Sequence, residues 1–290
     1  MESRPCNVCQ SGLRSDGTRY LGEVNRHHTY RCPACRLVFV YPKLTFDELD
    51  GIYDSYHDET DQLELNQAGE TDLFQEILRR LGSAKGQASG ELLDIGASFG
   101  HFLDLARKQG YTTKGVEIAK EPSEYARTVL GLDVECMSLE DAHFESERFS
   151  AVSLLNVLEH VPDPFKVLTE SWRITKPGGT IAIVVPNLLL AYPYLIATRS
   201  VGLKLNVPTS AYHVPFHLTL FGPASLRWML SATGWQNIEI TNAPVIRNRS
   251  RAKTLIKQTV RSLGDGLAML TGGALIYGYS LLAIAQREKR

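Results

Sequence analysis

The sequence predicts an α/β fold in which a mostly parallel sheet is covered by helices on both faces. Alternation of strands and helices is the first indication, since parallel sheets built this way are buried on both sides. A second is residues 91–100, where an apolar strand runs into a glycine-interrupted turn and then into an amphipathic segment. Further along, a short apolar segment follows almost every helical one. The strands expected from this pattern are 91–95, 112–118, 132–136, 149–155, 180–186 and 237–242.

The first 41 residues carry two Cys-x-x-Cys pairs, which indicate a zinc ribbon. Two such turns can present four thiolates tetrahedrally around one Zn²⁺, and four protein ligands make the metal structural. The alternative is two disulfides, which the absence of a secretory signal at the start of the chain disfavours. A fifth cysteine, Cys136, is expected to be a small buried residue. The expected zinc ligands are Cys6, Cys9, Cys32 and Cys35.

Residues 42–90 are expected to form a helical lid and linker. Thr45 and Glu48 have the spacing of a capping box at a helix start. A second helix is expected over Thr71–Leu81, and the glycine-rich segment Gly82–Gly90 ends it. We expect both helices to lie over the ligand pocket of the domain that spans residues 91–290.

The glycine turn after the first strand of that domain predicts a nucleotide-type ligand without a phosphate. Its pattern is Asp94-Ile-Gly-Ala-Ser-Phe-Gly100, which differs from the G-x-G-x-x-G spacing of dinucleotide sites. Glu117 follows the next strand, where a carboxylate can accept hydrogen bonds from both ribose hydroxyls. An acid at Asp94 suits a cationic amino group better than a pyrophosphate. These residues favour S-adenosylmethionine over NAD.

Four motifs in order resemble those of class I SAM-dependent methyltransferases. Residues 94–100 resemble the first motif and 116–118 the ribose-binding strand end. Residues 149–163 resemble the fourth-strand motif and 173–181 the turn before the fifth strand. The resemblance extends from residue 92 to about residue 286. It implies a Rossmann-like, seven-stranded methyltransferase sheet that closes with a reversed strand, residues 279–286. The order of zinc ribbon and methyltransferase is similar to that of bacterial enzymes that modify sugars and small-molecule precursors.

The resemblance also implies which residues hold the cofactor. Ser98 stands where the family usually has a second glycine, and Ser138 where an aspartate often precedes the adenine pocket. The side chain that meets the adenine amine is therefore left open among Leu139, Glu140 and Asp141. The cofactor-binding residues expected on this basis are Asp94, Gly96, Ala97, Ser98, Gly100, Glu117, Ile118, Leu139, Glu140 and Asn156.

Two histidines are the candidates for taking a proton from a hydroxyl acceptor. His160 lies just past the fourth strand and can instead begin a helix that packs under the cofactor. His217 lies near the end of a long insertion, residues 187–220, that is expected to cover the open strand ends as a lid. We expect His217 to be the base and His160 to act mainly on cofactor binding, while an ordering role for His217 in the lid is the alternative.

The C-terminal region allows three interpretations. Residues 266–286 contain no charged side chain, and this uncharged stretch is long enough for a membrane span. Two glycines interrupt the stretch, and the fold needs a buried final strand from it. The third interpretation is a basic amphipathic helix over 251–270, with peripheral membrane contact through the basic segment 247–261.

Composition restricts the choice of acceptor. The 290 residues are 43% hydrophobic and carry a formal net charge of −1, so no bulk positive field attracts a phosphate backbone. Nucleic acid is therefore disfavoured as a partner, although an RNA methyltransferase that uses its ribbon for binding is one alternative. A non-catalytic SAM-binding protein is another. We expect a cytoplasmic enzyme, in part membrane-associated, that methylates a small-molecule or sugar-type acceptor, at oxygen because histidines rather than an amine cage populate the lid.

Overall fold

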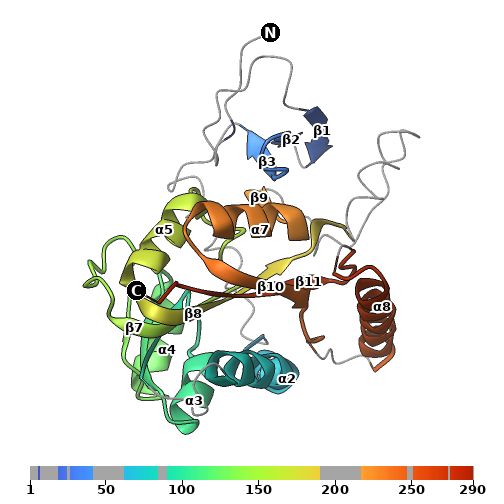
Figure 1. Ribbon diagram of the computed structural model, residues 1–290. Helices are drawn as coiled ribbons and strands as arrows, with labels where there is room; N and C mark the ends of the chain where they lie inside the picture. Colours follow the sequence, from blue (N-terminus) through green and yellow to red (C-terminus); the bar gives the residue numbers. More distant parts are fainter. Residues whose placement is uncertain are drawn as a thin grey trace.

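A seven-stranded, mostly parallel sheet forms the centre of the molecule (Figure 1). The computed structural model describes residues 6, 19–24, 27–41, 62–83, 90–189, 217–246, 251–273 and 275–289. The strands lie in the order β10-β11-β8-β7-β4-β5-β6, and β11 runs antiparallel to both of its neighbours. Their bounds are β4 Glu91–Ile95, β5 Thr112–Val116, β6 Val134–Glu135, β7 Phe149–Leu155, β8 Thr175–Pro186, β10 Gln236–Asn242 and β11 Ser280–Gln286. The predicted fold class and its reversed closing strand are confirmed.

Helices cover both faces of this sheet (Figure 1). One apolar cluster joins the sheet to side chains of α2, α3 and α4, and a second joins it to α5, α7 and the N-terminal strands. The sheet strands are buried on both sides, which explains their nearly continuous apolar sequences. The bounds are α2 Gln62–Ser83, α3 His101–Lys108, α4 Lys120–Thr128, α5 Pro164–Ile174, α7 Pro223–Ala232 and α8 Arg251–Leu270.

Helix α2 belongs to the core of the domain, which differs from the lid expected for Thr71–Leu81. Leu73, Ile77 and Leu78 are almost fully buried and share one apolar cluster with Leu92 of β4. Leu73 and Ile77 lie one helical turn apart and Leu78 is about 100° further round, so the three side chains define a broad buried face of the helix. This face is used against the sheet, so the helix cannot at the same time be a movable cover. Residues 42–61, with the expected capping box, lie outside the described residues.

A second, smaller sheet connects the N-terminal module to the large domain. Its order is β1-β2-β3-β9, with β1 at Arg19–Val24, β2 at His27–Arg31 and β3 at Val38–Tyr41. Strand β9 is Thr219–Leu220, which comes from the large domain and pairs antiparallel with β3. The N-terminal strands are therefore built into the main domain through a shared sheet.

The structure decides between the interpretations of the C-terminal region. Ser280–Gln286 is strand β11, inserted between β8 and β10, and its Leu281 and Leu282 are fully buried. Arg251–Leu270 is helix α8 at the edge of the molecule beside β10. Among the described residues, no helix has the length and apolar character needed to cross a bilayer. The uncharged stretch is thus divided between the end of α8, a glycine turn and a core strand.

Candidate functional site

The candidate site lies where strands β4 and β7 lie side by side at the centre of the sheet. From β4 the chain proceeds through α3 to β5 on one side, and β7 lies on its other side. In open α/β sheets this change of direction leaves a crevice at the carboxyl ends of the strands, where ligands bind. The glycine turn follows β4, and Asn156 follows β7. The topology therefore brings two of the predicted motifs to one edge.

The glycine turn is held in a shape that side chains would prevent. Gly96 has φ +72°, and a Cβ there would meet Val157 at 2.4 Å; Gly100 has φ +81°, and a Cβ would meet Leu132 at 2.6 Å. The amides of Gly96 and Ala97 both donate to the carbonyl of Val116, which fixes the turn on β5. Ser98 also has a positive φ, +47°. A glycine adopts this conformation without strain, so the backbone here is one that would suit the glycine expected from the resemblance.

Asp94 is buried just before the turn. Its carboxylate accepts a hydrogen bond of 2.7 Å from the Ser153 hydroxyl on β7. Burial raises the pKa of Asp94 to about 8, and the Ser153 hydrogen bond lowers it only in part. A cationic group bound at this edge would offset the cost of ionising the buried carboxyl, and the ammonium of S-adenosylmethionine is such a group. Ser153 is a site residue that sequence reasoning missed, because a serine inside an apolar strand gives no distinctive signal.

Glu117 connects the turn to the next strand end. Its two carboxylate oxygens accept from the amides of Ser98 and Ala119, each at 2.8 Å. Each oxygen keeps a second lone pair that can accept from a hydroxyl. The neighbouring Ile118 is 52% exposed although it is apolar and follows a core strand. An exposed apolar side chain beside a fixed carboxylate suits a ligand with a flat base and a ribose.

The predicted adenine segment forms a tight turn. The Ser138 hydroxyl donates to Asp141 at 2.6 Å and accepts from the Asp141 amide at 3.2 Å. The Leu139 side chain is buried in the core, whereas Glu140 is partly exposed. Asp141 is thus already hydrogen-bonded within the turn. The expectation for Cys136 is wrong: it is exposed, with its thiol 3.7 Å from the carbonyl of Ile118.

His160 and His217 lie against each other beyond the end of β7, and Asn156 directly follows that strand. Asn156 is exposed with φ +56°, a conformation that asparagine tolerates better than most residues. The rings of His160 and His217 lie with their centroids 4.9 Å apart and their planes at 65°. His217 is buried and His160 partly exposed. The two predicted histidines therefore form one cluster, although 56 residues separate them in sequence and 190–216 of the insertion lie outside the described residues.

Glu159 completes this cluster. A nitrogen from each histidine and an oxygen of Glu159 all lie within 4.8 Å of one another, and the His160 Nε2–Glu159 Oε1 distance is 3.8 Å. The Glu159 side chain is 2% exposed, and neither carboxyl oxygen has a hydrogen-bond partner within the described part of the chain. Burial raises its pKa to about 8. Such a donor set can hold a divalent metal or support a proton transfer.

Sequence reasoning did not single out Glu159. The available signal was an acid in the otherwise apolar stretch that ends with His160. That signal is weak, because a glutamate at this position fits a solvated helix start equally well.

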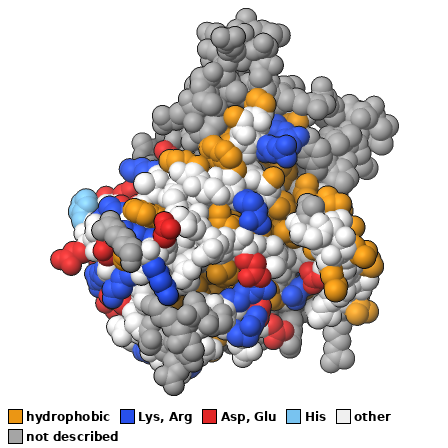
Figure 2. Space-filling view, viewed as in Figure 1, with side chains coloured by type: hydrophobic (Ala, Val, Ile, Leu, Met, Phe, Trp, Pro, Cys, Tyr) orange, Lys and Arg blue, Asp and Glu red, His pale blue; other side chains and the backbone are white. Residues whose placement is uncertain are grey.

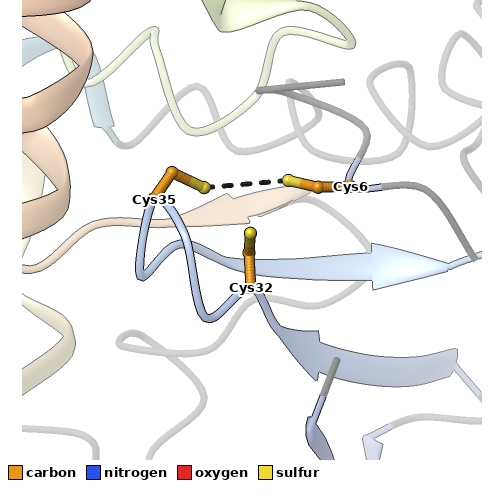
Figure 3. Close-up of side chains that lie close together, drawn as sticks. All are labelled: Cys6, Cys32 and Cys35. Atoms are coloured by element: carbon orange, nitrogen blue, oxygen red, sulfur yellow. Dashed lines mark hydrogen bonds between the residues drawn. The ribbon is translucent and has the colours of Figure 1, made fainter. Parts of the chain in front are cut away.

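Three of the four predicted zinc ligands come together at the N-terminal sheet (Figure 3). Cys32 and Cys35 flank a turn between β2 and β3, and Cys6 approaches from the other side. The Cys6 and Cys35 sulfurs are 3.7 Å apart. Sulfurs about 2.3 Å from a tetrahedral Zn²⁺ lie about 3.8 Å from each other, so the observed distance fits. Cys9 lies outside the described residues.

The thiols in this group are buried and form no disulfide among the described cysteines. The neighbouring Cys6 and burial raise the pKa of the Cys35 thiol, and burial raises that of Cys32. Ionising several buried thiols next to one another is unfavourable. A cation bound between them stabilises the thiolates and removes this cost. The residues present therefore fit a structural zinc ion.

The N-terminal sheet is hydrogen-bonded to the segment that carries His217. The Val40 amide of β3 donates to the Leu218 carbonyl at 3.0 Å. The amides of Leu218 and Thr219 donate in turn to the Glu159 carbonyl, at 2.8 and 3.2 Å. This continuous path runs from the cysteine module to the Glu159–His160–His217 cluster. The position of His217 therefore depends on both parts of the chain.

Comparison with known proteins identifies the class. A family model described as a methyltransferase domain matches residues 66–240, which is more than half of the chain. The chain belongs to this methyltransferase family and is a SAM-dependent methyltransferase of class I.

Among curated relatives, it is similar to the ubiquinone biosynthesis O-methyltransferase of Aliivibrio fischeri strain MJ11. Identity is 31% over 168 residues, or 56% of this chain and 70% of the relative. The protein of the same name from Thiobacillus denitrificans is 29% identical over 160 residues, or 53% and 68% of the two chains.

Solved structures confirm the fold. Haemonchus contortus phosphoethanolamine N-methyltransferase 2, in complex with S-adenosyl-L-methionine, superposes with a TM-score of 0.55 and 16% identity. The alignment covers 87% of this chain and 62% of that one. A SAM-dependent methyltransferase from Archaeoglobus fulgidus superposes with a TM-score of 0.53 and 19% identity. The alignment covers 79% of this chain and 100% of that one.

Proposed function

We propose that this enzyme transfers a methyl group from S-adenosylmethionine to a hydroxyl of a small-molecule or glycosyl acceptor. When bound, the cofactor supplies an electrophilic methyl group on a sulfonium. The glycine turn would hold it, with Glu117 on the ribose and Asp94 near the ammonium. The observation that carries the oxygen assignment is the Glu159–His160–His217 cluster at the carboxyl end of β7, next to the strand that bears Asp94.

His217 would act as the base. Methylation of a hydroxyl requires that its proton leave, and an imidazole at hydrogen-bonding distance can accept it. As His217 gains the proton it becomes a cation close to the buried carboxyl of Glu159. A carboxyl oxygen of Glu159 can accept a hydrogen bond from that imidazolium, so no second proton has to leave. Glu159 would thus be a positioning residue for the histidines, while His160 would act mainly on cofactor binding.

A metal-assisted mechanism uses the same three side chains but is less well supported. A metal bound here would have to displace a proton from Glu159, whose pKa burial raises to about 8. The base mechanism needs no additional ion. We therefore retain it as the proposal and let added metal be one of the outcomes of the test.

The acceptor class is supported by two independent points. The first is the relatives named as ubiquinone biosynthesis O-methyltransferases, which make a small aromatic hydroxyl compound a reasonable first substrate class. The second is the formal net charge of −1, which disfavours a nucleic-acid acceptor. An RNA methyltransferase or a non-catalytic SAM-binding protein is less well supported on these grounds.

We further propose that Cys6, Cys9, Cys32 and Cys35 hold one structural Zn²⁺. The spacing of the Cys6 and Cys35 sulfurs supports this, as does the burial of the three thiols. The zinc would fix β3 and, through Val40, the segment that carries His217.

A screen with isotopically labelled cofactor tests the proposed reaction. Purified enzyme is incubated with methyl-labelled S-adenosylmethionine and panels of phenolic, catecholic and glycosyl acceptors, with matched amines and small RNAs as controls. The proposal expects a methyl ether product, located by NMR, at a rate that added Mg²⁺ or Mn²⁺ does not raise. Transfer to nitrogen or RNA alone would contradict it, and strong stimulation by added metal would replace the base mechanism with a metal-assisted one.

A further inference from the structure

Helix α8 carries its apolar side chains on the side that faces solvent. Ile256, Leu263, Leu267 and Leu270 follow one another at spacings of seven, four and three residues, which places them on one helix face. Leu263 is 71% exposed and Leu270 87%. Figure 2 shows apolar side chains gathered over this helix at the right of the molecule. The α8 apolar face is made up of Leu255, Ile256, Leu263, Leu267, Met269 and Leu270.

The opposite side of α8, which faces the protein, is small and polar. Gly264 lies so close to the Tyr277 carbonyl that a Cβ there would overlap with it. Asp265 accepts a hydrogen bond of 2.7 Å from Asn242, the last residue of β10. The Lys257 ammonium lies 5.6 Å from the ring centre of Tyr279. A helix that packs on a core normally turns its apolar face inward, so this inverted arrangement leaves the apolar face for another partner.

The helix is also strongly basic. It contains Arg251, Lys253, Lys257 and Arg261 against the single acid Asp265, a formal charge of four minus one, or +3. Asp265 lies 3.4 Å from Arg261, so this pair is neutral and the net charge of the helix comes from Arg251, Lys253 and Lys257. An exposed apolar face on a basic helix is the combination that binds in the headgroup region of anionic membranes.

We propose that α8 docks on the surface of an anionic lipid bilayer. A second copy of the chain is the other occupant to consider, but two such helices would bring +3 against +3, which opposes pairing. The turn after the helix adds exposed apolar surface, since Leu275 is 47% exposed. Its two glycines, Gly272 and Gly273, have open space around them. The exposed apolar surface of this turn would extend the docking surface beyond the end of α8.

Docking in this way would bring the candidate site to the membrane surface. Asn187, just past β8, is hydrogen-bonded to the segment that follows α8. Its amide donates to the Tyr279 carbonyl at 2.9 Å, and its side chain donates to the Ile276 carbonyl at 3.0 Å. The carboxyl end of β8 neighbours that of β7, where the Asn156 amide donates to the Val184 carbonyl. The docking surface and the candidate site therefore share one edge of the sheet.

Vesicle flotation with the full-length protein tests the proposal. The wild type is mixed with vesicles of phosphatidylcholine alone or with added phosphatidylglycerol. We expect binding to the anionic vesicles that weakens with salt, and little binding to the neutral ones. The triple variant Leu263→Ser, Leu267→Ser, Leu270→Ser should bind at least about 100-fold more weakly, because each exposed leucine contributes about tenfold when it enters an apolar phase.

Val129→Ser is the matched control, since Val129 is equally apolar, 61% exposed and located after α4. It should bind like the wild type, and all three proteins should bind S-adenosylmethionine equally, which separates this test from that of the enzymatic proposal. Absence of wild-type binding to anionic vesicles, or equal binding by the triple variant, would overturn the proposal. So would a wild-type dimer in light scattering that the triple variant breaks, since the face would then serve a second copy.

Discussion

Replacing Glu117 by alanine is the perturbation that the structure defines best for the cofactor. The carboxylate accepts two amide hydrogen bonds of 2.8 Å, from Ser98 and Ala119, and would accept two more from a ribose. Hydrogen bonds to a charged acceptor contribute about 1.5–3 kcal/mol each. Loss of the two ribose bonds at the lower end corresponds to about 3 kcal/mol, or about 100-fold in affinity. Because Glu117 is partly exposed and solvent weakens such bonds, we expect affinity to fall at least about tenfold.

Isothermal titration calorimetry with S-adenosylmethionine measures this change. Glu117→Gln keeps a carbonyl acceptor of the same shape, so its affinity should lie between those of wild type and Glu117→Ala. Glu124→Ala, on the exposed face of α4, is the control for loss of one negative charge and should bind like the wild type. Unchanged affinity in Glu117→Ala would mean that the ribose lies elsewhere, and the assignment of the whole glycine turn would then be wrong.

Three further predictions concern the metal, the buried acids and the connection between the two sheets. Protein purified without chelator should contain one zinc per chain; Cys32→Ser should lose the metal and the ordered ribbon while the domain 91–286 still unfolds cooperatively, and metal analysis that finds no zinc would refute this. Asp94 and Glu159 have folded pKa values raised to about 8 from ordinary values near 4, so the folded protein holds extra protons and its stability should fall as pH rises from about 4 to about 8. Denaturation curves of Glu159→Gln should show a shallower decline, and an unaltered slope would show that Glu159 does not titrate in this range. Val40→Pro removes the amide that donates to Leu218, loses a buried side chain and puts a proline ring into β3, so it should cost more than the about 0.5–1.5 kcal/mol of one hydrogen bond and should lower turnover with cofactor affinity intact; equal turnover would show that the ribbon does not position the site.

Strand positions and the glycine turn could be predicted from the sequence because their causes are local. The strand 91–95 is apolar on both faces, and Gly96 and Gly100 occupy φ values that other residues avoid. Glu117 could be predicted as a ligand-binding acid because it directly follows a buried strand, at the edge of the sheet where ligands bind. The reversed final strand came only from the family resemblance, since an uncharged run has no period that separates a strand from a membrane segment.

Other features depend on contacts that join distant parts of the chain. Pairing of β3 with β9 crosses about 180 residues and has no local signature. The same is true of Glu159, whose role follows from the histidine that folds against it. The sequence predicts α2 as a lid because its apolar face does not reveal what it packs against. For Cys136, residue type suggests burial, whereas the strand end where it lies leaves it exposed.

The rate of methyl transfer in the two histidine variants tests the central claim most directly. At saturating S-adenosylmethionine and with a hydroxyl acceptor found in the screen, single-turnover rates are measured across pH for wild type, His217→Ala and His160→Ala. The account predicts that the wild-type rate rises with pH as an imidazole loses its proton, and that His217→Ala is slower by about 10²–10⁴-fold, without that step, at nearly unchanged cofactor affinity. His160→Ala should mainly weaken cofactor binding. If His217→Ala keeps both its rate and its pH step while His160→Ala loses turnover at saturating cofactor, the base has been assigned to the wrong histidine.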